Sequence, residues 1–227
     1  VNRSENMQWY NGGTLLHNLE TVHIGSDENH IDCRFPVQTV IRPHSEEFHD
    51  YRGYAGRVAG GVFKPGDEIA VQPSGLTSRI KTVEFNGEEL QEAFAPMSVT
   101  LTLEDDIDVG RGDMIVRKNN QAEATQDLDV MLCWLHSNPP RPRTKYILRQ
   151  TSKESRAMIS EVVYKMDINS LHRNEEDKDI QMNDIARVKI RSTKPILKDS
   201  YRINRNTGSI ILVDEATNET VAAGMLN

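Results

Sequence analysis

The chain has 227 residues, of which 37% are hydrophobic and 27% charged, and its formal net charge is −7. This composition predicts a water-soluble globular protein, because no apolar run approaches the roughly 18–20 residues that a membrane helix needs. Residues 1–120 hold 11 Lys and Arg against 19 Asp and Glu, and residues 121–227 hold 16 against 15, so the acidic first half argues against a general nucleic-acid surface there.

The first predicted element is a short helix at residues 14–22, with the sequence TLLHNLETV. Leu15, Leu16 and Leu19 share one face at helical spacing, and Thr14 is a candidate N-cap. We therefore expect one helix of about two turns near the N-terminus.

From residue 35 onward, short stretches alternate between apolar and polar residues, which is the pattern of half-buried strands. Turn signals such as Pro65-Gly66 and Asn86-Gly87 separate them. The predicted strands are 35–40, 69–71, 98–103, 114–116, 128–135, 145–149, 157–166, 186–191, 209–213 and 221–226. This spacing predicts an all-β protein with two consecutive antiparallel barrels, at residues 31–120 and 121–227, joined by a polar linker at 117–126.

A glycine-rich stretch at residues 52–69, RGYAGRVAGGVFKPGDEI, raises the question of a phosphate-binding loop. Such a loop must lead into a helix. Here Lys64-Pro65-Gly66 follows within three residues of Gly61 and prevents one. We therefore interpret the stretch as a strand whose glycines permit tight coiling and close backbone approach.

Two further polar motifs are interpreted as loops and not as functional sites. The sequence His44-Ser45-Glu46-Glu47-Phe48-His49 lacks the spacing of a zinc-binding His-Glu-x-x-His motif, and we interpret it as a solvated loop. The sequence Asn138-Pro139-Pro140-Arg141-Pro142-Arg143 resembles a polyproline ligand but lies between two predicted strands, which favours a stiff loop. No Ser/His/Asp set, Cys/His set or carboxylate pair is indicated, so we expect neither catalytic nor metal-binding residues in the chain.

A basic run begins in the predicted strand at 186–191. Arg187, Lys189 and Arg191 alternate with apolar residues and therefore project to one side of the strand. Such a row is either a solvated face or a surface for an anionic partner. Tyr201 is the one aromatic residue near it, whereas single-stranded nucleic acid is usually bound on several aromatic rings.

Several stretches carry a resemblance to a known family. They are Trp9-Tyr10 with Leu15-Leu16, the stretch Arg52–Ala59 followed by Lys64-Pro65-Gly66-Asp67-Glu68, Leu101–Asp105 with Arg111-Gly112-Asp113, and Asn204–Gly208 with Ile211–Asp214 and Thr220–Met225. Together they resemble the large, GTPase subunit of the bacterial heterodimeric ATP sulfurylase, a relative of the translational GTPases of the elongation factor Tu type. The match covers nearly the whole chain.

The resemblance implies the fold of domains II and III of elongation factor Tu, with residues 1–30 as the end of a GTPase domain and its linker helix. It implies a cytoplasmic sulfate adenylyltransferase whose GTP hydrolysis helps to drive formation of adenylyl sulfate from ATP and sulfate. GTP and Mg²⁺ would bind before Val1, so this fragment is expected to be inactive alone and to hold no cofactor. A product-phosphorylating kinase is fused to some members.

The implied partners are the chain's own GTPase domain and a small catalytic subunit, in a heterodimer, with neither membrane nor nucleic acid expected. Candidate contacts with the partner are Arg187, Lys189, Arg191, Arg205 and Thr207. The alternative is a pair of RNA-binding barrels from an elongation-factor-like translational GTPase. Cys33 and Cys133 are expected to be free thiols, which suits a reducing cytoplasm.

Overall fold

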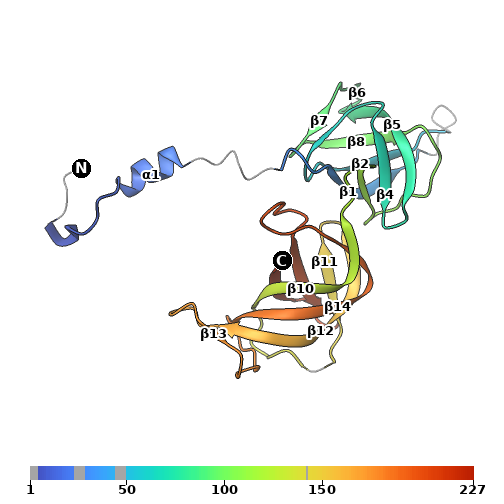
Figure 1. Ribbon diagram of the computed structural model, residues 1–227. Helices are drawn as coiled ribbons and strands as arrows, with labels where there is room; N and C mark the ends of the chain where they lie inside the picture. Colours follow the sequence, from blue (N-terminus) through green and yellow to red (C-terminus); the bar gives the residue numbers. More distant parts are fainter. Residues whose placement is uncertain (1–4, 23–28, 44–49, 142) are drawn as a thin grey trace.

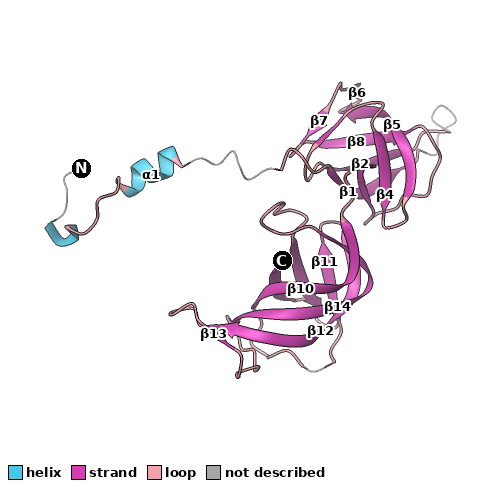
Figure 2. Ribbon diagram, viewed as in Figure 1, coloured by secondary structure: helices cyan, strands magenta, loops and turns pink. Residues whose placement is uncertain are grey.

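The computed structural model describes residues 5–22, 29–43, 50–141 and 143–227. Two β-barrels are stacked on each other, and an N-terminal arm projects away from them (Figure 1). The arm holds a 3-10 turn, η1 (Glu5–Met7), and the helix α1 (Leu15–Thr21). Nearly all of the remaining regular structure is strand (Figure 2).

The first barrel is an antiparallel sheet with the strand order β4-β9-β1-β2-β8-β5-β6. A further pairing of β4 with β5 closes six of these strands into a ring, while β3 and β7 form a separate small ribbon. The strands are β1 (Arg34–Ile41), β2 (Gly53–Arg57), β3 (Val62–Phe63), β4 (Glu68–Gln72), β5 (Leu76–Phe85), β6 (Glu88–Glu89), β7 (Ala93–Phe94), β8 (Ser98–Leu103) and β9 (Met114–Arg117).

The second barrel has the order β11-β15-β16-β10-β14-β12-β13 and is closed by a pairing of β11 with β12. It is also antiparallel in every described pairing. The strands are β10 (Glu123–Trp134), β11 (Tyr146–Gln150), β12 (Lys153–Met166), β13 (Arg173–Asn174), β14 (Ile185–Lys198), β15 (Ser209–Asp214) and β16 (Thr220–Leu226).

Each barrel surrounds its own apolar core, which is formed by the inward-facing side chains of its strands. Phe35 and Phe63 meet edge to face inside the first barrel, and Trp134 and Tyr146 do the same inside the second. Large buried side chains such as Leu132 fill the remaining space. The prediction of an all-β protein with two consecutive antiparallel barrels and one short helix is therefore confirmed.

The glycine-rich stretch forms strands and turns. A Cβ atom on Gly56 would overlap the carbonyl oxygen of Pro36 on the neighbouring strand β1. Gly61 has φ +72°, and a Cβ there would lie 2.6 Å from the Sγ atom of Cys33. The glycines thus allow the backbone of one strand to approach the next, as expected.

The strands depart from the sequence-based expectation in several places, including the short strands β6, β7 and β13, which were not predicted. The ten-residue strand β5 was not predicted, because a register shift between Ile80 and Thr82 interrupts its alternation. The predicted linker at 117–126 is not a free tether. Ala122 is 8% exposed and β10 already begins at Glu123.

Candidate functional surfaces

A buried ion pair joins the two barrels. Arg34, on the first strand of the first barrel, donates from Nε (2.8 Å) and from its terminal nitrogen (3.0 Å) to the carboxylate of Asp199 in the second barrel. The side chains are 4% and 10% exposed. Such a paired geometry is needed to offset the cost of removing both charges from water.

Further hydrogen bonds complete this junction. Thr207 donates its hydroxyl proton to Asp199 (2.7 Å), and Arg34 also donates to the carbonyl and side-chain oxygens of Asn120. Asn204 donates to the carbonyl oxygen of Ala59 across the two barrels (2.9 Å). A small apolar cluster lies beside them, formed by Ala70, Met114, Val116, Ala122 and Leu197. The junction is therefore a packed, hydrogen-bonded interface.

Three of the candidate partner contacts lie on β14, and each faces an acidic residue. Arg187 donates two hydrogen bonds to Asp129 on β10, at 2.8 and 2.7 Å. Lys189 lies 3.9 Å from Glu161 on β12, and Arg191 forms an ion pair with Asp127. The Arg187 hydrogen bonds hold the pKa of Asp129 below its usual range. The row that looks basic in the sequence is therefore largely neutralised across the sheet.

The other two candidates lie in the loop before β15. Arg205 is exposed and belongs to the face of this loop that points to solvent. The Thr207 side chain is fully buried and hydrogen-bonded to Asp199. Thr207 can therefore shape a partner surface only indirectly, by holding the loop that carries Arg205. A partner role for all five residues stays a prediction.

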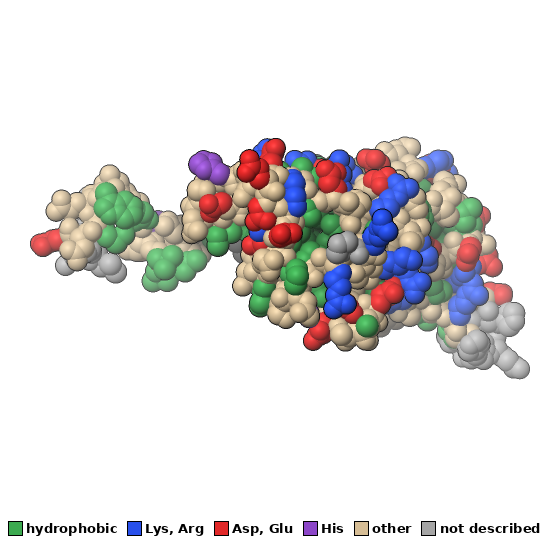
Figure 3. Space-filling model, turned by 90° about the horizontal axis from the view of Figure 1, so that it is seen from below, with side chains coloured by type: hydrophobic (Ala, Val, Ile, Leu, Met, Phe, Trp, Pro, Cys, Tyr) green, Lys and Arg blue, Asp and Glu red, His purple; other side chains and the backbone are tan. Residues whose placement is uncertain are grey.

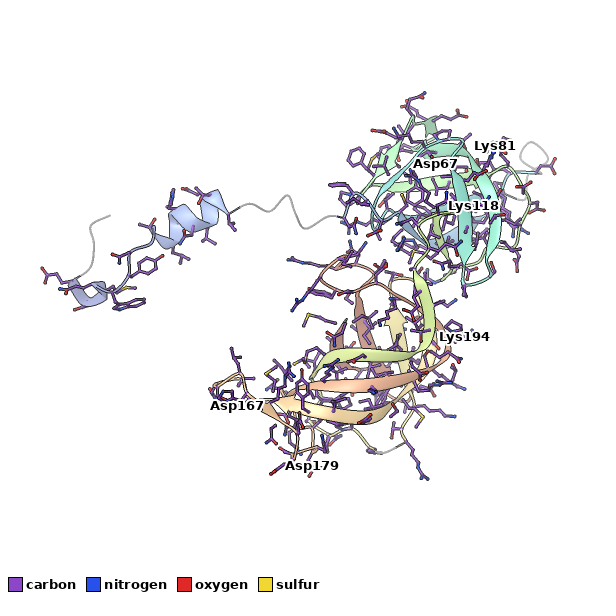
Figure 4. All side chains as sticks on the ribbon, viewed as in Figure 1. Asp67, Lys81, Lys118, Asp167, Asp179 and Lys194 are labelled. Carbon is purple, nitrogen blue, oxygen red and sulfur yellow. The ribbon has the colours of Figure 1, made fainter. Side chains whose placement is uncertain are left out.

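The first barrel has a broad groove on its outer surface, with a volume of about 920 Å³. Tyr51, Glu84 and Lys81 are among the residues that line it, and Figure 4 labels Lys81 on this barrel. Tyr51 donates to Glu84 (2.7 Å), and burial together with this hydrogen bond raises the pKa of Tyr51. Arg52, also in the lining, is paired with Asp106 and bonded to the carbonyl oxygen of Ile107.

The N-terminal arm presents apolar side chains to solvent. Thr14 caps α1 as predicted, accepting a hydrogen bond from the His17 backbone (3.1 Å). The helix nevertheless buries none of its residues, and Leu15 and Trp9 are each 75% exposed. A row of leucines at helical spacing normally packs against another surface.

Other sequence motifs give no site in the described residues. The stretch 44–49, with its two histidines, lies outside them. In the part of the chain that the structure describes, no cluster of three His, Cys, Asp or Glu residues could hold a metal ion, and no helix is long and apolar enough to cross a membrane. Cys33 and Cys133 are free thiols, and burial raises the pKa of Cys33.

Comparison with known proteins gives sequence relatives along the whole chain. The family described as "GTP-eEF1A C-terminal domain-like" matches residues 127–227. The "Bifunctional enzyme CysN/CysC" of Mycobacterium tuberculosis is 45% identical over 227 residues, which are 100% of this chain and 37% of that protein. "Sulfate adenylyltransferase subunit 1" of Bacteroides fragilis is 43% identical over 100% of this chain and 46% of its own length.

A solved structure shares the fold at low sequence identity. Sup35 complexed with GDP superposes with a TM-score of 0.78 at 16% identity, covering 96% of this chain and 52% of Sup35. The chain spans less than half the length of the two curated relatives above.

Proposed function

Because this chain is homologous over its whole length to one part of sulfate adenylyltransferase subunit 1 and of its CysN/CysC relatives, we propose that it forms the non-catalytic barrel portion of a sulfate-activating GTPase subunit. The observation that carries the proposal is the 43–45% identity over the entire chain. In the proposed complex, a small catalytic subunit transfers the adenylyl group of ATP to sulfate in the cytoplasm. GTP hydrolysis in the remaining part of the large subunit helps to drive that reaction.

We assign GTP and Mg²⁺ to the part of the protein outside this chain. The arm at residues 1–30 is then the connection to the GTPase domain, and the apolar side chains of α1 pack against it. This assignment is supported by the exposure of Leu15, Leu16 and Leu19, which face solvent at 64–75%. It also agrees with the division into residues 1–30, 31–120 and 121–227, which remains part of the proposal.

The barrels act in this scheme as one coupled body. The buried Arg34–Asp199 pair and the hydrogen bond from Asn204 to Ala59 resist any change in the angle between the barrels. A movement of the GTPase domain against one barrel is then passed to the other as a rigid-body displacement. The partner subunit would sense the nucleotide state through that displacement.

The test is a pull-down of the small sulfurylase subunit by the full-length large subunit. We expect a stable complex, and we expect adenylyl sulfate synthesis by that complex to rise when GTP is present. If both proteins are folded and no complex forms at micromolar concentration, the proposal is wrong. A large subunit that binds its partner but leaves synthesis unchanged by GTP would overturn the coupling role alone.

A further inference from the structure

Within the described residues, three basic side chains of the second barrel form no ion pair. Residues 130–153 contain five Lys and Arg and no Asp or Glu, in a chain whose net charge is −7. Arg149 pairs with Glu154 (2.9 Å) and Lys153 lies 3.6 Å from Asp113. The other three are exposed, and within the described residues their side chains form no hydrogen bond or ion pair. They are Arg141, Arg143 and Lys145, which we call the basic loop.

Two core aromatic residues anchor this loop. The indole N–H of Trp134 donates to the carbonyl oxygen of Asn138 (2.8 Å), and Tyr146 is the first residue of β11, directly after the loop. The two rings are in edge-to-face contact, with centroids 5.9 Å apart, and are 1% and 4% exposed. A turn within the loop is closed by the Thr144 N–H and the Arg141 carbonyl oxygen (3.2 Å). Hydrogen bonds therefore anchor the described residues at both ends of this stretch.

The acidic residues nearest to the loop are already engaged. Asp214 is the last residue of β15 and lies opposite Tyr146 of β11. It accepts hydrogen bonds from the backbones of Ala216 (2.8 Å) and Thr217 (3.0 Å). Those bonds, with a smaller contribution from Arg141, lower the pKa of Asp214.

The next acids in the same turn, Glu215 and Glu219, pair with Arg156 (2.6 Å) and His136 (3.4 Å). Figure 3 shows several Lys and Arg side chains on this face of the molecule, with Asp and Glu side chains among them. The charge of the basic loop is thus left for a group outside the described chain.

We propose that the basic loop is a docking site for an acidic surface of a partner protein. This inference rests on the proposed function, which supplies the partner as the small catalytic subunit. Neighbouring cations that have no ion-pair partner in the described chain can each form a charge-assisted hydrogen bond with a carboxylate of the partner. The docking contact therefore lies on this loop and not on β14, where Asp127, Asp129 and Glu161 already pair with the basic row.

A protein partner fits the site better than a nucleic acid does. Single strands are bound on exposed aromatic rings, but Trp134 and Tyr146 are buried beneath the loop. Arg187 and Arg191 of β14 are paired with acids, which interrupts a positive track along that strand for a phosphate backbone.

The test measures the affinity of the full-length large subunit for the small subunit by calorimetry. The triple variant Arg141→Glu/Arg143→Glu/Lys145→Glu should bind at least tenfold more weakly, and the Gln triple variant should fall in between. Wild-type affinity should drop with added salt, and that dependence should be smaller in the Gln variant. The control, Lys81→Glu/Lys118→Glu/Lys194→Glu, makes the same charge change at exposed positions away from the loop (Figure 4) and should bind within twofold of wild type.

The outcomes separate this inference from the proposed function. If the wild-type subunits bind and the loop variant binds equally well with an unchanged melting temperature, the docking site is wrong while the proposed function stands. If the wild-type subunits do not bind each other, both the docking site and the proposed function are wrong. A loop variant that loses affinity for transfer RNA or for a second copy of the chain, and keeps its affinity for the small subunit, also overturns the inference.

Discussion

At the scale of single residues, close contact with a neighbouring backbone explains why glycine is required at Gly56 in the first barrel. Gly56 lies where strand β2 meets β1, and its missing side chain is what lets Pro36 approach. Gly110 is a useful contrast, because a Cβ atom there would lie 3.7 Å from its nearest neighbour and would meet no backbone. The sequence predicts a strand glycine at Gly56, but only the packing shows which backbone atom its missing side chain would meet.

Gly56→Ala should destabilise the first barrel by about 2–4 kcal/mol, because the added methyl group forces β1 and β2 apart. Urea unfolding followed by circular dichroism measures the change. Gly110→Ala is the matched control and should alter the free energy of unfolding by less than about 1 kcal/mol. Equal effects of the two substitutions would contradict the strand-contact explanation.

At the scale of elements, regular alternation was enough to place a strand. The stretch SVTLTL was predicted as 98–103, and β8 spans Ser98–Leu103. Strand β5 was missed because its bulge moves the buried positions out of step, from Ile80 to Val83.

The partner surface was harder to predict than the strands. The basic row on β14 is evident from its own spacing, but the acids that neutralise it come from β10 and β12, about sixty and thirty residues earlier in the chain. Only the register of the sheet brings them together. The same holds for Thr207, whose burial depends on Asp199 and the first barrel.

The pairing of β10 with β14 gives the protein a specific acid sensitivity. Arg187 lowers the pKa of Asp129 in the folded state, so this carboxylate stabilises the fold above its unfolded pKa of about 3.9. That contribution is lost as the pH falls below about 4 toward the folded pKa. Asp129→Asn should therefore reduce stability at pH 7 by about 1 kcal/mol, and the difference from wild type should shrink by pH 2–3.

Urea titrations of both proteins at several pH values test this expectation. They are followed by tryptophan fluorescence, in which Trp134 is the buried reporter and Trp9 is exposed. A difference that stays constant from pH 7 to pH 2 would assign the effect of the substitution to packing and not to charge.

At the scale of the whole molecule, the junction makes two barrels behave as one. The polar stretch 117–126 resembles a flexible linker in sequence, because Asn120 and Gln121 are surrounded by other polar residues. In the fold, Asn120 receives hydrogen bonds from Arg34 and donates one to Asp32 (2.8 Å). Contacts that lie far apart in the chain thus turn the predicted linker into part of the interface.

Arg34→Met should separate the unfolding of the barrels. The substitution keeps much of the side-chain volume but leaves Asp199 buried without its cation, at a cost of about 3–5 kcal/mol. We expect wild type to unfold in one transition, and the variant to show a Trp134 fluorescence transition that no longer coincides with circular dichroism. Adding Asp199→Asn should restore part of the loss, and a single coincident transition in Arg34→Met would refute the coupling.

The closure of both sheets into rings has a consequence for handling the protein. An open sheet ends in a row of unpaired amide and carbonyl groups, which can recruit strands from other molecules and seed fibrils. Here β4 pairs with β5, and β11 with β12, so each ring satisfies its own edges. Concentrated samples of the chain should therefore resist amyloid-like stacking through the barrels. Any aggregation should begin at the N-terminal arm, whose apolar side chains are exposed.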